Sequence, residues 1–306
     1  MIGFHSSRVI LLFTCTLIFS SAHVLGGDDR HTLTLEWQRS KETLSGEKGS
    51  TQIAPIIVNI HYAYQFEDAW SMAVSAWDGE DEKSWDGTLF LSNQLRGLSA
   101  AFSFQQNSWW LDAGAQTSTT DTRLYVKGAN QSYSEKNDIL DLFVNYNFDL
   151  DWRGWWITPG VGIGYQQSRA EIQSQEIPIR MRDSVWRVNA SQRQDQNGSY
   201  LSGRLTLAYP MPASESVLYL PALSLDWIEP LWGKVYSRTL QEGMNSTATR
   251  RQSSTQSENA SADGSGFLGV GVTILLDQYS AGLTVTEPIA DDQLGTQIGF
   301  QLGMNF

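Results

Sequence analysis

Hydrophobic and polar side chains alternate along most of this chain with a period of two. The last segment, 296–306, shows the pattern clearly: large apolar side chains fall on one face, and Gly, Gln and Asn residues fall on the other. Because successive side chains of a β-strand point to opposite faces, this pattern predicts strands with one apolar face and one small, polar face. The apolar face of the last segment consists of Ile298, Phe300, Leu302, Met304 and Phe306.

Twelve strands are predicted, and the connections between them are alternately short and long. Five short turns are flanked by aromatic residues, whereas the long connections are rich in Ser, Gln, Asn, Arg and Glu. This asymmetry is typical of up-and-down barrels of the outer membrane. The long connections include 79–95, 119–137, 167–198 and 229–264, and the strands are expected at 31–40, 53–64, 69–78, 96–105, 109–118, 138–148, 155–166, 199–209, 216–228, 265–275, 279–287 and 294–306.

The composition of the two faces favours a membrane barrel over a soluble β-sandwich. The face rich in Gly, Ser and Thr would make a poor packed core, and aromatic residues cluster at strand ends as they do in interfacial girdles. We therefore predict a closed, antiparallel, transmembrane β-barrel of twelve strands, with Val144 facing lipid and Asn145 facing the lumen. Pro159 and Pro221 lie inside predicted strands, where a missing N–H predicts a bulge or a local loss of pairing.

The N-terminal segment has the order of a secretory signal peptide. Arg8 precedes the apolar run 9–20, and Ser20 and Ala22 occupy the small-residue positions of a cleavage site. We expect cleavage after Ala22, with a cut near Gly26 as the alternative. The expected domains are 1–22 (signal peptide), 23–30 (short periplasmic segment) and 31–306 (barrel).

Removal of the signal peptide would take away the single cysteine and the positive charge of Arg8. The remaining 284 residues would then carry a net charge of −13 instead of −12 and no disulfide. Such an acidic chain is a poor partner for nucleic acid.

The last strand resembles the C-terminal signal that the outer-membrane assembly machinery recognises in Gram-negative barrel proteins. Phe306, Met304, Leu302 and Phe300 carry this resemblance. It implies a bacterial outer-membrane location with both termini in the periplasm, and outer-membrane lipid, lipopolysaccharide and the barrel-assembly machinery as partners. The size and the twelve strands most resemble the translocator barrel of autotransporters, but without a passenger, since about eight residues separate the expected cleavage site from the first strand.

Few charged residues fall on the predicted lumen face, and this favours a passive or weakly selective channel for small solutes. The alternative is a structural or adhesive barrel with a closed lumen, whose external loops bind an unidentified partner or surface. The alternation along the strands also places Leu218, Leu220 and Phe143 on the inward face, where they would narrow the lumen. The expected register places Ala222 opposite Arg204. The candidate lumen residues are His61, Asp112, Asp141, Arg204 and Asp226.

The sequence predicts no enzyme, metal site or cofactor. A barrel-borne serine hydrolase needs a Ser–His pair, and His61 beside Ser71 is the one candidate, with no acid to orient it. The segment 167–198 carries arginines that alternate like a hairpin above the membrane. Because guanidinium binds phosphate bidentately, these arginines suggest contact with lipopolysaccharide or a pore constriction, and an ordinary mixed-charge loop is the third interpretation. The candidates are Arg180, Arg182 and Arg187.

Overall fold

The computed structural model is all-β over the residues that it describes. Residues 1–29, and with them the predicted signal peptide, lie outside the described residues. Among the described residues, no helix has the length and apolar character needed to cross a membrane. The described ranges are 30–46, 49–67, 69–85, 89–126, 131–181, 184–244, 249–259, 264–289 and 294–306.

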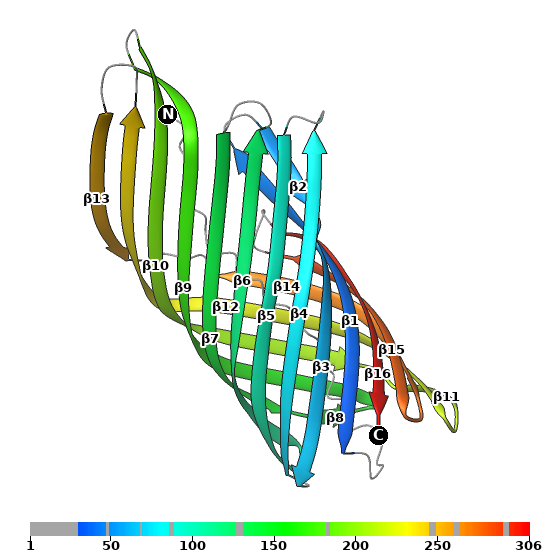
Figure 1. Cartoon of the computed structure of the whole chain (residues 1–306). Helices are drawn as coiled ribbons and strands as arrows, with labels where there is room; N and C mark the ends of the chain where they lie inside the picture. The colour runs from blue at the N-terminus through cyan, green and yellow to red at the C-terminus, as the bar shows by residue number, and fades with distance from the viewer. Residues whose placement is uncertain are drawn as a thin grey trace.

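Twelve antiparallel strands form a closed barrel, as the sequence predicts (Figure 1). Neighbours in sequence are neighbours in the sheet, and pairing of the last strand with the first closes the ring. Four shorter strands, β2 (Gly49–Ile53), β8 (Leu150–Trp152), β11 (Met211–Ser214) and β13 (Thr249–Asn259), extend single barrel strands. The barrel strands are β1 (His31–Gly46), β3 (Ile56–Glu67), β4 (Trp70–Trp85), β5 (Leu89–Gln106), β6 (Trp109–Val126), β7 (Gln131–Phe148), β9 (Trp155–Met181), β10 (Ser184–Ala208), β12 (Val217–Met244), β14 (Ser265–Leu276), β15 (Tyr279–Pro288) and β16 (Leu294–Asn305).

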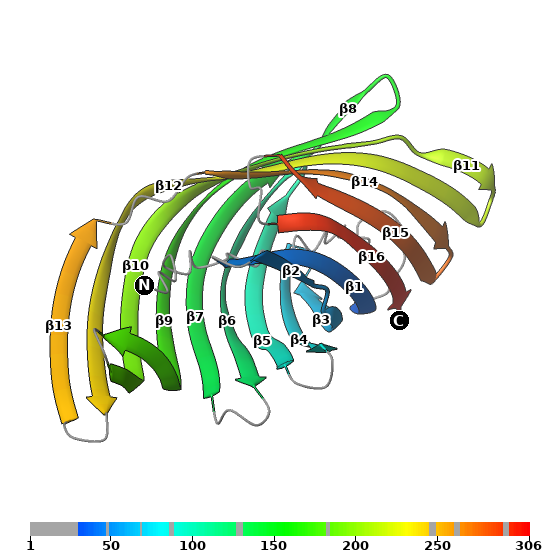
Figure 2. The same ribbon diagram turned by 90° about the horizontal axis from the view of Figure 1, so that it is seen from above.

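The two ends of the barrel differ. At one end, here called the turn end, lie the short connections, residue 30 and residue 306 (Figures 1 and 2). At the other, here called the extended end, β9, β10 and β12 continue as the longest strands, with 27, 25 and 28 residues, and β13 pairs with β12. With 27 residues, β9 spans about 90 Å at 3.3 Å per residue, three times the roughly 30 Å of a hydrocarbon core. The structure therefore carries a sheet well beyond the height of a bilayer.

These long strands correct the predicted loops. Most of 167–198 and 229–264 forms β9, β10, β12 and β13 rather than irregular loops. The sequence missed them because both faces of this part of the sheet carry polar residues, so the apolar half of the alternation is absent. The predicted hairpin of the arginine segment is confirmed, since β9 and β10 pair up to Met181 and Ser184.

An apolar belt surrounds the outside of the barrel between the two ends. Val144 is 43% exposed and points outward, while Asn145 lines the lumen, as predicted. Apolar side chains exposed in a continuous ring are stable only against lipid. Other members of the belt are Ile60, Val74, Leu98, Phe102, Leu142, Val161, Ile163, Leu205, Leu223, Val270, Leu283 and Phe300.

The two prolines lie where barrel pairing ends, and neither produces a bulge. Pairing between β7 and β9 stops at Gly160 and resumes with β8 at Ile157, so Pro159 faces a gap in the ladder. The carbonyl of Pro221 accepts a hydrogen bond from the Tyr209 amide (3.0 Å), just beyond the last β10–β12 pair. The predicted loss of pairing is confirmed beside Pro159, whereas the register runs without a shift through both prolines.

The first and last barrel strands are sealed together at the turn end. The amide of His31 donates to the Phe306 carbonyl (3.0 Å), and the amide of Phe306 donates to the His31 carbonyl (2.9 Å). Their rings stack with centroids 5.3 Å apart. Phe306 therefore completes the seam through both its backbone and its ring.

Candidate functional site

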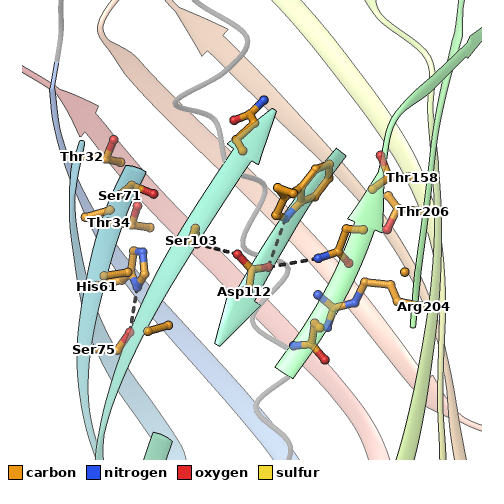
Figure 3. Close-up of a pocket in the computed structure, with 18 of the residues that line it drawn as sticks. Thr32, Thr34, His61, Ser71, Ser75, Ser103, Asp112, Thr158, Arg204 and Thr206 are labelled. Atoms are coloured by element: carbon orange, nitrogen blue, oxygen red, sulfur yellow. Dashed lines mark hydrogen bonds between the residues drawn. The ribbon is translucent and has the colours of Figure 1, made fainter. Parts of the chain in front are cut away.

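The turn-end half of the barrel encloses a cavity of about 850 Å³. Its mouth lies among residues of the turn end such as Arg30, Ser108 and Asp149. Figure 3 shows the wall above the mouth, where mainly small polar side chains point inward from neighbouring strands. The lining also includes Gln116 and the buried residues Trp77, Asp141, Tyr200 and Ile228.

Buried, inward-facing side chains from several strands lie at the end of this cavity away from its mouth. Ile57, Trp77 and Leu95 form a buried apolar cluster on three successive strands, with exposures of 1%, 8% and 2%. A Cβ at Gly97 would overlap the Trp77 ring, so the indole lies directly over the backbone of β5. We call the set of buried, inward-facing residues at this height the closing layer. It consists of Ile57, Trp77, Leu95, Ile139, Asp141, Tyr200, Ile228 and Phe267.

Asp141 ties the polar side of the closing layer together. Its carboxylate is fully buried; the Tyr200 hydroxyl donates to it at 2.9 Å, and the Gln116 amide donates at 3.1 Å. Tyr200 reaches Asp141 across β9 by lying over Gly164, where any Cβ would overlap the phenol ring. One carboxylate therefore joins β6, β7 and β10 along the same side of the barrel wall.

Arg204, Asp226 and Asp112 form a second polar group on the lumen wall. Arg204 lies directly opposite Asp226, and its Nε donates to the Asp226 carboxylate at 2.5 Å. Asp112 accepts hydrogen bonds from Ser103, Trp110 and Asn147 (Figure 3). The positive charge of Arg204 also attracts its carboxylate. Arg204 therefore compensates part of the negative charge of Asp112 and Asp226.

The predicted partner of Arg204 was wrong. Ala222 pairs with Ala208, and Asp226 takes the place opposite Arg204. The register differs from the expected one by four residues, because β11 continues the pairing of β10 with β12 as far as a turn at Glu215 and Ser216.

His61 points into the lumen but forms no catalytic triad. Its Nδ1 lies 2.7 Å from the Ser75 hydroxyl, which is directly opposite in the register, rather than from Ser71. The acid on the neighbouring strand, Glu36, accepts a hydrogen bond from Asn59 instead. The pair therefore lacks a carboxylate to orient the imidazole.

Arg180 and Arg187 of the extended hairpin are not among the residues that line the cavity. Arg180 pairs with Val185 near the tip of the β9–β10 hairpin, and Arg187 is exposed on β10. Arg182 lies outside the described residues.

The sequence analysis did not predict the closing layer. A large inward residue such as Trp77 lies directly opposite a glycine, Gly97, and this pairing could have indicated the layer. The pairing is known only when the register of the strands is known.

Comparisons with known proteins identify the fold. No family model and no curated protein matches this chain. The structure is similar to the translocator domain of the autotransporter NalP from Neisseria meningitidis, with a TM-score of 0.59 and 11% identity, over 94% of this chain and 92% of that chain. It is also similar to the β domain of the Bordetella autotransporter BrkA, with a TM-score of 0.50 and 11% identity, over 91% of this chain and 99% of that chain. The chain therefore has the fold of an autotransporter-type outer-membrane barrel.

Proposed function

We propose that this chain is an integral protein of the bacterial outer membrane, with the turn end in the periplasm and the extended end outside the cell. The barrel fold and the apolar belt support the membrane location. Outer-membrane barrels place short turns in the periplasm and longer segments outside, and this supports the orientation. Both the His31 end and the Phe306 end would then be periplasmic.

We further propose a structural or adhesive role, in which a closed barrel anchors the external sheet of β9, β10, β12 and β13 (Figure 2). The observation that carries this proposal is the closing layer. A conducting lumen needs a continuous water path, and we infer that the buried Ile57–Trp77–Leu95 cluster, together with the buried Asp141 and Tyr200, blocks that path. The sheet is long, polar and free of the barrel wall at its outer end, as a surface for an external partner requires.

A channel for small solutes is the second candidate, and the cavity itself favours it. Small polar residues such as Ser71, Ser103 and Thr206 line a water-accessible space that reaches the turn end. A channel would require the closing layer to move aside. The chain is not proposed to be an enzyme, because the one Ser–His contact lacks an orienting acid.

Planar-bilayer recording of the refolded protein tests this proposal. The wild type should show no steady conductance, whereas Trp77→Ala/Leu95→Ala should conduct, because the double change removes two of the three side chains of the buried cluster. The matched control is Val74→Ala/Leu98→Ala, which removes apolar side chains from the same two strands on the lipid face, where they are 40% and 60% exposed. Steady conductance of the wild type would overturn the closed-lumen proposal in favour of the channel.

We also propose that Phe306 serves barrel assembly, and its deletion should lower the amount of protein in the outer membrane. The deletion removes two backbone hydrogen bonds and a stacked ring from the seam with His31. The measurement is heat-modifiable gel migration of membrane fractions, with protease sensitivity of the periplasmic chains. Trp152→Ala, which removes a 59% exposed aromatic side chain at the same end, should migrate normally. Normal levels and migration of the deletion variant would contradict the proposal.

A further inference from the structure

Basic residues gather on the outer wall of the barrel just beyond the apolar belt, at the extended end. One row across adjacent strands joins Lys136 to Glu171, Glu171 to Arg193, and Arg193 to Arg238, each directly opposite the next in the register. The row beneath it runs through Asp138, Arg169, Asp195 and Tyr236, and Lys234 lies below Tyr236 on β12. Figure 1 shows β7, β9, β10 and β12 side by side at this height.

The positive charge of this wall is only partly compensated. Arg169 and Arg193 share one carboxylate, Asp195, at 2.9 and 3.1 Å. Desolvation tends to raise the pKa of Asp195, but the hydrogen bonds and charges of the two arginines outweigh it and hold this pKa below its ordinary value. Asp195 therefore stays ionised, and its carboxylate is shared between Arg169 and Arg193.

On β12 no such compensation is found. Among the described residues, no carboxylate lies within ion-pair distance of Arg238 or Lys234. Arg238 stands directly across from Arg193, and like charges placed opposite each other in a sheet are destabilising. An anion between them would remove that repulsion and accept hydrogen bonds from two guanidinium groups.

Exposed aromatic and apolar side chains cover the outer wall between these cations and the apolar belt. Tyr165 and Trp232 lie with ring centroids 6.5 Å apart, and Trp232 is 53% exposed. Leu231, beside Trp232 at the bulge of β12, is also 53% exposed. Aromatic side chains at this position mark the interface between headgroups and hydrocarbon. A ligand that bridges the cations and this surface must have an anionic head and an apolar tail.

We propose that Arg193, Arg238 and Lys234 form a site on the outer wall for the phosphorylated headgroup of a membrane lipid, whose acyl chains lie along Trp232 and Leu231. The site is separate from the lumen and from the hairpin-tip arginines. Its place in the outer leaflet rests on the proposed orientation of the barrel, whereas binding itself can be measured with the purified protein.

The test is titration of the full-length protein in detergent with bis-phosphorylated lipid A, followed by tryptophan fluorescence and by microscale thermophoresis. Arg193→Ala/Arg238→Ala should weaken binding at least tenfold. Asp195→Asn should tighten it several-fold, because that change removes the acid that competes with phosphate for Arg193. The matched control is Arg123→Ala: this exposed arginine lies on the same outer wall but has its own carboxylate, Asp121, at 2.6 Å, and its loss should leave the affinity unchanged.

Two further arms define the chemistry of the ligand. Dephosphorylated lipid A should bind at least tenfold more weakly, and inorganic phosphate at the same concentration should not displace the lipid. Equal affinity of wild type and Arg193→Ala/Arg238→Ala, with normal heat-modifiable migration of the variant, would overturn the proposal. Equal binding of the dephosphorylated lipid would overturn it as well, and displacement by inorganic phosphate would show a plain anion site instead. None of these results depends on whether the lumen conducts.

Discussion

Val144→Arg is expected to destabilise the protein by about 2–4 kcal/mol, the cost of an arginine at the midplane of the lipid face of a barrel. Val144 lies between Leu142 and Tyr146 on the outward face of β7, and all three are more than 40% exposed. Its neighbours across the sheet are Ala113 and Ile163, so no acid lies beside it in the register to pair with the guanidinium. A charge there must stay in hydrocarbon or distort the bilayer to reach water.

The matched control is Asn145→Arg, one residue further along the same strand. Asn145 lines the lumen cavity beside Gly162 and Ser202, so the arginine can extend into water and should cost about 1 kcal/mol or less. Urea unfolding of both variants in lipid vesicles measures the two free energies. Equal costs would show that the two faces of β7 are assigned the wrong way round.

Arg204→Glu is expected to destabilise the barrel by about 1–3 kcal/mol and to leave bilayer conductance unchanged. Breaking a buried ion pair costs about 3–5 kcal/mol, but Arg204 keeps 40% of its side chain exposed to the cavity, so solvent screens part of the effect. The new carboxylate would face Asp226, which is 9% exposed at its side chain, and would lie near Asp112. Three acids would then share a site that one arginine now neutralises.

The charge-exchanged variant Arg204→Glu/Asp226→Arg separates this electrostatic effect from simple loss of packing. It restores an opposite pair at the same register position and should recover at least half of the lost free energy of unfolding. Melting temperatures and urea unfolding in vesicles measure the loss and the recovery. If the lumen were an open channel, Arg204→Glu would instead shift the reversal potential toward cations with little change in stability, and that result would contradict the closed-lumen proposal.

The number of strands and the division of their faces follow from local sequence. From Leu140 to Phe148 in β7 and from Ile298 to Met304 in β16, every second residue is large and apolar, and the opposite face is mostly small or polar, so the period of two is clear. The same alternation placed Val144 outward and Phe143 and Leu220 inward, as the structure has them. The prediction succeeded because a lipid-facing strand imposes its pattern residue by residue.

Where lipid no longer imposes that pattern, the prediction failed. Towards the extended end, β9 and β12 are strands because neighbouring strands supply their backbone hydrogen bonds. Their side chains do not alternate between apolar and polar there. The partner of Arg204 was misplaced for a related reason: the register depends on where the turn after β11 lies, and a shift of four residues replaces Ala222 with Asp226.

The sequence by itself determined that this chain forms a twelve-stranded barrel with an apolar outside, because each strand that faces lipid needs its own row of apolar outward side chains. Only the tertiary structure decided what fills the lumen and what gathers on the outer wall. Trp77 and Leu95 meet Ile57 because the barrel closes with one particular register, and Arg193 stands opposite Arg238 for the same reason. Such contacts join residues that are far apart in the sequence, and no local pattern specifies which of them will share a height on the barrel.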